Sequence, residues 1–144
     1  MKECIFCKII NGELPGSIIH KDDLCVAFLD IHPMSPGHIL VVPRDHAAGL
    51  ADLPPETGAH IFQIGQMLAA KLKSVHENVA GTNLLLNDGR VAWQSVFHLH
   101  LHVIPRRKGD SLKVSKNIAL HMTGVMGPAA KRDQLEAMAE SLRG

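Results

Sequence analysis

The sequence has almost no excess charge and no long apolar segment. Its 144 residues carry a formal net charge of +1, so we expect no broad basic face for nucleic acid. No apolar run approaches the roughly 18 residues that a membrane-spanning helix needs, which argues against a membrane partner. Neither absence excludes a small ligand such as a nucleotide, because such a ligand needs only a local site.

Cysteine is scarce, and the residues from Met1 to Cys4 lack the apolar stretch and small-residue cleavage site of a signal peptide. The three cysteines are an odd number, so without an export signal we expect no disulfide framework. Internal repeats and low-complexity linkers are also lacking. We therefore expect one domain over residues 1–144, located in the reducing cytoplasm.

The most distinctive stretch is residues 97–104, in which three histidines alternate with apolar residues. A period of two is typical of a β-strand, whose successive side chains point to opposite faces. The pattern therefore predicts His98, His100 and His102 on one face. The core face would carry the residues between them, which are Phe97, Leu99, Leu101 and Val103. Pro105 is expected to end the strand, because it cannot donate to a ladder.

Imidazole can act as a nucleophile, a general base or a metal ligand near neutral pH. One plain interpretation is that the histidines are half-exposed surface residues, but three on one face of an apolar strand do not favour it. A metal site built from all three is also disfavoured. Alternate residues of one strand lie about 6.5–7 Å apart, too far for all three to reach one ion at about 2.1 Å.

A second pattern is the pair Cys4 and Cys7, whose spacing lets two thiolates converge on one ion. By itself the pair is compatible with a redox couple, half of a zinc site, or two small buried residues. The redox interpretation requires a preceding strand, which does not fit within three residues of the start. Cys25 lies in an apolar stretch and is expected in the core.

The remaining patterns predict a mixture of helices and strands. A helical turn is predicted near residues 4–10, four strands at 17–20, 24–29, 38–42 and 82–86, a long amphipathic helix from Asp52 to Gly81, and a C-terminal helix from Pro128 to Leu142. The long helix carries no recognisable chemistry, and we expect its histidines, His60 and His76, to be solvated. Residues 111–126 show poor periodicity.

Residues 94–105, QSVFHLHLHVIP, resemble the motif of the histidine triad (HIT) family of nucleotide hydrolases and transferases. The resemblance implies an α+β HIT-like fold, with a five-stranded antiparallel sheet, one long helix and a C-terminal helix. It also implies a single HIT domain over residues 1–144, paired as a homodimer through the long helix. Residues 107–144 would be the more variable part, which in the family can touch the partner's active site.

The resemblance further implies two-step covalent catalysis. His100 would attack the α-phosphorus of a purine nucleotide conjugate, and water would then hydrolyse the nucleotidyl-histidine. His102 and Ser95 would hydrogen-bond the phosphate and the leaving atom, and Gln94 would hold the non-bridging oxygens. His98 would orient His100.

The nucleotide-binding positions implied by the resemblance are Phe6, Ile9, Leu14, Phe28, Asp30, Ile31, Asn87, Gln94, Ser95, His100 and His102. Asp30 would accept hydrogen bonds from the ribose hydroxyls, and Asn87 would bind sugar or phosphate. The chain departs from the family pattern at His32, often a small polar residue, and at Trp93, usually glycine.

Family members that begin like this chain bind zinc with two cysteines and two histidines. The matching residues are Cys4, Cys7, His46 and His98. Four protein ligands leave no open position, so such a zinc would be structural.

The motif leaves the substrate open. Ser95 is similar to the nucleoside phosphoramidase branch, whereas Ile104, Pro105 and Arg106 are similar to the branch that hydrolyses dinucleoside polyphosphates. We expect hydrolysis of AMP conjugates, chiefly at P–N bonds. The alternatives are dinucleoside polyphosphate hydrolysis, nucleotidyl transfer to another acceptor, a nucleotide-binding module without turnover, and a metal-storage or redox role.

Overall fold

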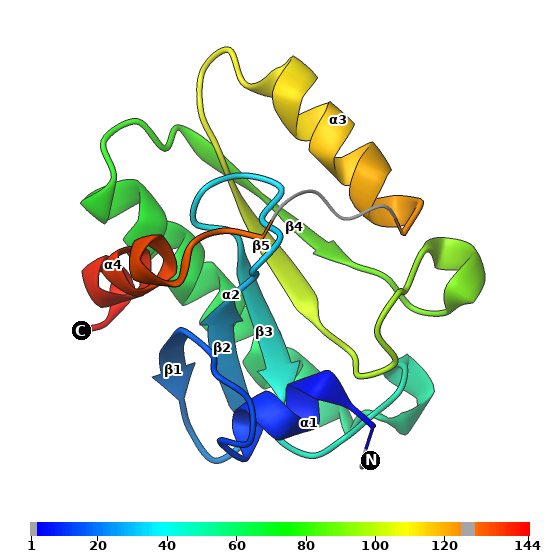
Figure 1. The fold of residues 1–144 in the computed structure, drawn as a ribbon. Coiled ribbons are helices and arrows are strands. Elements are labelled where there is room, and N and C mark those ends of the chain that lie inside the picture. Colours follow the sequence, from blue (N-terminus) through cyan, green and yellow to red (C-terminus); the bar gives the residue numbers. More distant parts are fainter. Residues whose placement is uncertain (1–2, 125–128) are drawn as a thin grey trace.

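The computed structural model describes residues 3–124 and 129–144 (Figure 1). Five strands form one antiparallel sheet in the order β1-β2-β3-β5-β4. The strands are β1 (Ile18–Lys21), β2 (Cys25–Leu29), β3 (Ile39–Pro43), β4 (Gly81–Leu86) and β5 (Leu101–Arg106). The α-helices are α1 (Ile5–Ile10), α2 (Pro55–Val75), α3 (Ser111–Met122) and α4 (Arg132–Leu142). The predicted α+β class and five-stranded antiparallel sheet are confirmed.

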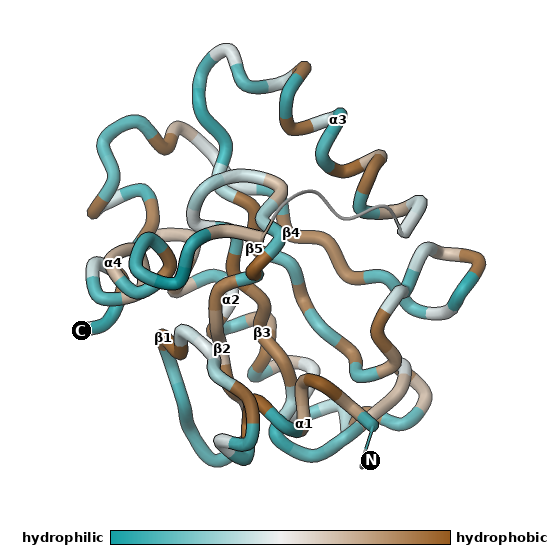
Figure 2. Tube along the Cα trace, viewed as in Figure 1, coloured by the Kyte–Doolittle hydropathy of each residue, from teal (hydrophilic) through white to brown (hydrophobic). Residues whose placement is uncertain are grey.

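The two faces of the sheet are covered by different helices. Helices α2 and α4 pack on one face, where they contact alternate residues of the central strands β2 and β3, such as Ala27 and Val41. The residues between these, such as Phe28 and Leu40, pack against α1 on the other face. Both central strands are therefore apolar along their whole length, as Figure 2 shows. In β5, Leu101 and Val103 join the α2 side, so the alternation places His102 on the opposite face.

The histidine strand is shorter at its start than predicted. Pairing begins at Leu101. In the approach before it the chain bends at residues 96–98, and the Leu99 N–H donates to the Ala47 carbonyl at 2.8 Å. The prediction that Phe97 is a core residue is wrong. Its side chain is 40% exposed and the Arg90 guanidinium lies 5.2 Å from its ring centroid.

Pro105 does not end the strand, which continues to Arg106. The Arg106 carbonyl accepts from the Ala80 N–H at 2.9 Å, so the backbone of Arg106 faces the β4 side. The backbone of Pro105 must then face the β3 side, where pairing has already stopped at Val103. A missing N–H there leaves no ladder position unpaired, and the strand tolerates the proline.

Two helix predictions need correction, and a further helix was not predicted. The long helix ends at Val75, and Asp52 lies in a preceding 3₁₀ turn and does not cap it. The last helix begins at Arg132, whereas its predicted first residue, Pro128, lies outside the described residues. Residues 111–122, which show no clear periodicity, form α3. No helix in the described part of the chain is long and apolar enough to cross a membrane.

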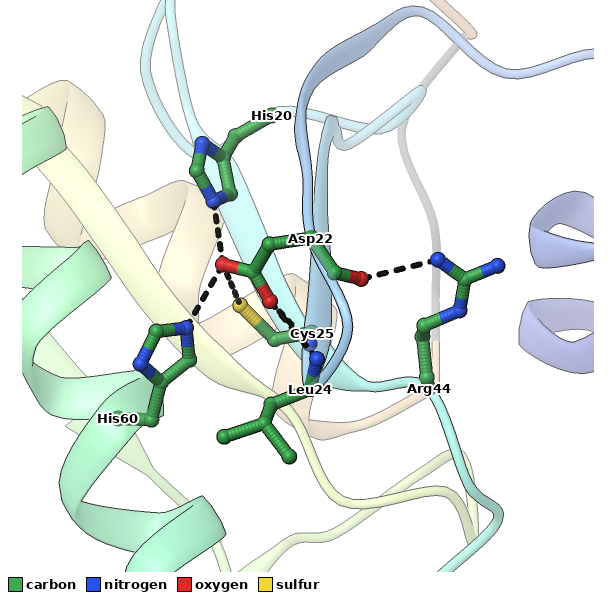
Figure 3. A network of polar contacts seen from close by, with 6 residues as sticks. All are labelled: His20, Asp22, Leu24, Cys25, Arg44 and His60. Atoms are coloured by element: carbon green, nitrogen blue, oxygen red, sulfur yellow. Dashed lines mark hydrogen bonds and ion pairs between the residues drawn. The ribbon is translucent and has the colours of Figure 1, made fainter.

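His60 is not simply solvated, because it joins α2 to the β1–β2 hairpin through Asp22 (Figure 3). The Nε2 atoms of His20 and His60 lie 2.6 and 2.7 Å from Asp22 Oδ2, while the N–H groups of Leu24 and Cys25 donate to Oδ1. Ligand atoms around a shared tetrahedral ion are roughly 3.3 Å or more apart. The group is therefore a hydrogen-bonded clasp between the hairpin and the helix, rather than a metal site.

Candidate functional site

A cavity of about 440 Å³ opens between α1, β2, the approach to β5 and the end of α3. Nine of the expected nucleotide-binding residues line it: Phe6, Ile9, Leu14, Phe28, Asp30, Ile31, Ser95, His100 and His102. The structure therefore brings together expected residues from position 6 to position 102 of the sequence. Asn87, Gln94 and His98 do not line the cavity.

One end of this cavity is apolar and aromatic. The rings of Phe6 and Phe28 meet edge to face, with centroids 5.4 Å apart. Phe6 also lies edge to face against His100 at 5.2 Å. Ile9 and Leu14 extend the same wall. An apolar slot that ends at a histidine suits a planar, weakly polar group joined to a polar or charged one.

His100 is held with one ring nitrogen available. Its Nδ1 lies 2.8 Å from the His98 carbonyl oxygen, which can only accept, so Nδ1 carries the proton. Burial lowers the pKa of His100 below its ordinary value of 6.5. The ring is therefore neutral at neutral pH, and Nε2 keeps an unshared electron pair. This is the protonation state of a nitrogen nucleophile.

His102 presents the opposite chemistry, because a second histidine fixes its tautomer. The Met34 N–H donates to His38 Nδ1 at 3.1 Å, so the proton of a neutral His38 lies on Nε2. That Nε2–H donates to His102 Nδ1 at 2.9 Å, which leaves the proton of His102 on Nε2. Burial lowers the pKa of His38 to about 4 and that of His102 to about 2, so both rings are neutral. An N–H donor therefore lies beside the lone pair of His100, with ring centroids 4.8 Å apart.

Asp30 places a negative charge on the same cavity. Its Oδ1 accepts from the His32 N–H at 2.8 Å, and its Oδ2 lies 3.5 Å from His121 Nε2. Burial alone would raise the pKa of Asp30, but the hydrogen bond from His121 and the positive charge that His38 gains at acid pH outweigh it and hold the pKa at about 2. The carboxylate is therefore ionised at neutral pH and can accept hydrogen bonds from hydroxyl groups.

The four expected zinc ligands lie together beneath α1. All donor atoms of Cys4, Cys7, His46 and His98 are within 4.8 Å of one another. The Nδ1 atom of His98 is 3.3 Å from Cys4 Sγ and 3.5 Å from Cys7 Sγ, and His46 Nδ1 is 3.5 Å from Cys7 Sγ. His98 Nε2 donates to the Pro43 carbonyl at 2.8 Å, so Nδ1 keeps the lone pair that a metal needs. These separations and this donor set fit a tetrahedral Zn²⁺.

Gln94 and Asn87 shape the loop before the histidines. The Gln94 amide accepts from the Gly89 N–H at 2.8 Å and donates to the carbonyls of Ala48 and Val96. Asn87 Nδ2 lies 3.4 Å from the Trp93 carbonyl oxygen. The buried Gln94 amide is thus used by the backbone of this loop, rather than facing the cavity.

Two histidines of this site, His38 and His121, were not identified from the sequence. His38 directly precedes the apolar strand β3, and a polar residue at such a position is a signal that could have found it. His121 lies in a segment without clear periodicity, and no sequence signal points to it.

Comparison with known proteins gives one consistent family. The HIT domain family model matches residues 11–109. An uncharacterized HIT-like protein of Mycobacterium tuberculosis is 45% identical over 117 residues, or 81% of each chain. The adenosine 5′-monophosphoramidase of Schizosaccharomyces pombe is 41% identical over 72% of this chain and 74% of its own. The crystal structure of a Zn-bound histidine triad family protein from Mycobacterium smegmatis aligns with a TM-score of 0.81 and 36% identity, covering 99% of this chain and 91% of that one.

Proposed function

Because this chain belongs to the HIT family, we propose that it is a hydrolase that cleaves AMP conjugates at the α-phosphorus, with P–N phosphoramidates as the preferred class. The observation that carries the proposal is the pairing of two neutral histidines with opposite roles. His100 offers a lone pair on Nε2, and His102 offers an N–H beside it. The similarity to a protein named adenosine 5′-monophosphoramidase supports the choice of substrate.

In the first step, His100 Nε2 forms a bond to the α-phosphorus, and the bond from phosphorus to the leaving nitrogen breaks. The departing nitrogen takes the bonding electron pair and a proton, and the Ser95 hydroxyl at the cavity wall is the donor we assign to it. The Nε2–H of His102 hydrogen-bonds the non-bridging oxygens, where negative charge increases during attack.

In the second step, water attacks the same phosphorus and the P–N bond to His100 breaks, with its electron pair returning to Nε2. The proton that the water loses restores the Ser95 hydroxyl. A phosphorylated imidazole is itself a good leaving group, so the intermediate hydrolyses and His100 is regenerated. The hydrogen bond from its Nδ1 to the His98 carbonyl is available in both steps and holds the ring in one orientation.

The rest of the cavity binds the nucleotide in this proposal. The base lies against Phe6 and Phe28, and the ribose hydroxyls donate to Asp30. A structural zinc would be held by Cys4, Cys7, His46 and His98. It would fix α1 and the approach to β5 relative to one another.

We also propose a homodimer formed through α2, whose surface exposes the large apolar side chains of Phe62 and Met67. One HIT domain would span residues 1–144, with α3 and α4 as its variable part. The three free cysteines fit a reducing compartment such as the cytoplasm.

The test is release of AMP from adenosine 5′-phosphoramidate and from diadenosine polyphosphates by the wild type and by His100→Ala. We expect turnover of the phosphoramidate that is lost in His100→Ala. His76→Ala is the matched control, because His76 pairs with Ser141 and does not line the cavity. Turnover that persists in His100→Ala would contradict covalent catalysis. AMP binding without turnover would favour a binding module, and AMP transfer to added phosphate would favour a transferase.

A further inference from the structure

We propose that His121 is a fourth histidine of this site, a positioning residue that holds the Asp30 carboxylate for the ribose of the bound nucleotide. The inference rests on the proposed function, which assigns the ribose to Asp30. It adds a residue from α3, outside the segment that the HIT domain matches.

The two oxygens of Asp30 are held in different ways. Oδ1 accepts from the backbone N–H of His32 at 2.8 Å. Oδ2 lies 3.5 Å from His121 Nε2 and 3.8 Å from His38 Nδ1. His38 Nδ1 already accepts from the Met34 N–H and has no proton to give in the neutral ring. His121 is therefore placed to donate to Oδ2, and the Asp30 and His121 side chains are only 10% and 13% exposed.

Helix α3 is anchored to the loop that follows Asp30. Val114 packs with Met34 and Ile104 in a small buried cluster. The Asn117 side-chain amide donates to the Met34 carbonyl at 3.0 Å. Because the Met34 N–H binds His38, one residue links α3 to the chain of histidines at the site. The position of His121 therefore follows from packing and hydrogen bonds upstream in its own helix.

His121 also shares the cavity wall with the histidines of the proposed reaction. It lines the cavity, and its ring centroid is 6.0 Å from that of His102 and 6.4 Å from that of His38. A carboxylate that accepts from ribose hydroxyls must be ionised and held in one orientation, and burial works against the charge. A hydrogen bond from His121 offsets that cost on the one oxygen that the backbone does not hold.

This arrangement predicts a selective effect on ribose recognition. A His121→Leu variant replaces the ring with an apolar side chain of similar reach and so removes the donor, whereas His121→Gln retains an N–H. Loss of the hydrogen bond should weaken AMP binding by about tenfold, as expected for a bond to a charged group. The affinity for 2′,3′-dideoxy-AMP should stay unchanged, because that ligand has no ribose hydroxyls that could donate hydrogen bonds to Asp30.

The experiment is calorimetric titration of AMP and 2′,3′-dideoxy-AMP into the wild type, His121→Leu, His121→Gln, Asp30→Asn and the double variant Asp30→Asn/His121→Leu. We expect His121→Leu to lose affinity for AMP only, His121→Gln to recover most of it, and His121→Leu to add little once Asp30 is replaced. Turnover of the phosphoramidate should show a raised KM with kcat nearly unchanged. His76→Leu, outside the cavity, is the matched control.

The inference would be overturned if His121→Leu lost equal affinity for AMP and for 2′,3′-dideoxy-AMP. It would also be overturned if the losses of AMP affinity added in the double variant, or if His121→Leu lowered kcat at constant KM. In each of these cases the wild type still binds AMP and turns over the phosphoramidate, so the proposed function stands. A wild type that binds neither nucleotide refutes the proposed function and, with it, the role of His121.

Discussion

The Nδ1–H of His100 donates to the carbonyl oxygen of His98 at 2.8 Å, while the ring of His98 lies among the cysteines beneath α1. The same residue thus orients the proposed nucleophile through its backbone and contributes to the candidate zinc site through its side chain. Because the two sites share His98, a substitution of a metal ligand should alter the orientation of His100, even though the ligand itself does not contact the substrate.

Loss of the metal should therefore lower both stability and turnover. In Cys7→Ser we expect little zinc by atomic emission, a lower Tm, and a kcat reduced by about tenfold or more, because outer ligands of this kind orient catalytic groups. Chelation of the wild type should do the same, and added Zn²⁺ should restore it.

Cys25→Ala is the matched control for the metal experiment, since Cys25 is fully buried on the opposite face of the sheet from the cluster. It should keep about one zinc per chain while losing some stability through the lost packing. A Cys7→Ser variant with normal zinc content and normal kcat would contradict the link through His98.

Replacing His38 should impair chemistry more than binding. His38→Phe keeps a ring at this buried position before β3 but removes the donor to His102 Nδ1, so the proton of His102 is no longer fixed on Nε2. We expect kcat to fall about 10- to 100-fold with KM little changed. A variant whose kcat matches that of the wild type would show that the tautomer of His102 is set in another way. Retained AMP affinity is the control for folding.

The period-two pattern of residues 97–104 predicted the shared face of the histidines although the ladder starts only at Leu101. His98 and His100 both lie edge to face against Phe6, so they keep the predicted shared side although the chain bends at residues 96–98 and pairing has not begun. The same reasoning failed for Phe97, because alternation gives the direction of a side chain and says nothing of whether a core extends that far.

Helix α3 and the two unforeseen histidines depend on contacts that no local pattern records. Helix α3 buries one residue, Val114, so its sequence shows no apolar stripe. His38, just before β3, binds His102 on the neighbouring strand β5, 64 residues away in sequence. Pairings of this kind follow from topology, which is fixed only once the sheet order is known.

The hydrogen-bonded clasp at Asp22 should make the protein less stable at acid pH. Burial alone would raise the pKa of Asp22, but the hydrogen bonds from His20 and His60 outweigh it and lower the pKa far below its ordinary 3.8. The stabilisation is therefore complete above pH 3.8, the value in the unfolded chain, and is lost as the pH falls below it. Asp22→Asn should lower Tm at pH 7. The difference in Tm between this variant and the wild type should become smaller below pH 4.

Thermal melts of both proteins between pH 7 and pH 2.5 check this prediction. His60→Asn, which removes the link from α2, should reproduce part of the loss at pH 7. A difference between wild type and Asp22→Asn that stays constant over the whole range would mean that the carboxylate charge contributes nothing to the clasp.

Trp93 is the position where relief of backbone strain should stabilise the protein. It is the non-glycine residue with positive φ in the described structure, at 68°, and its side chain is 59% exposed. A left-handed conformation costs a residue with a Cβ about 1–2 kcal/mol, whereas glycine adopts it freely. Trp93→Gly removes that strain but gives the unfolded chain more freedom, so we expect a net gain in the free energy of unfolding of about 0.5–1 kcal/mol.

Trp93→Ala keeps the Cβ and is the control that should show no gain. Urea unfolding of the three proteins measures the difference. A Trp93→Gly variant no more stable than Trp93→Ala would contradict the strain, whereas an equal loss of stability in both variants relative to the wild type would mean that the indole contributes packing beyond its exposed surface.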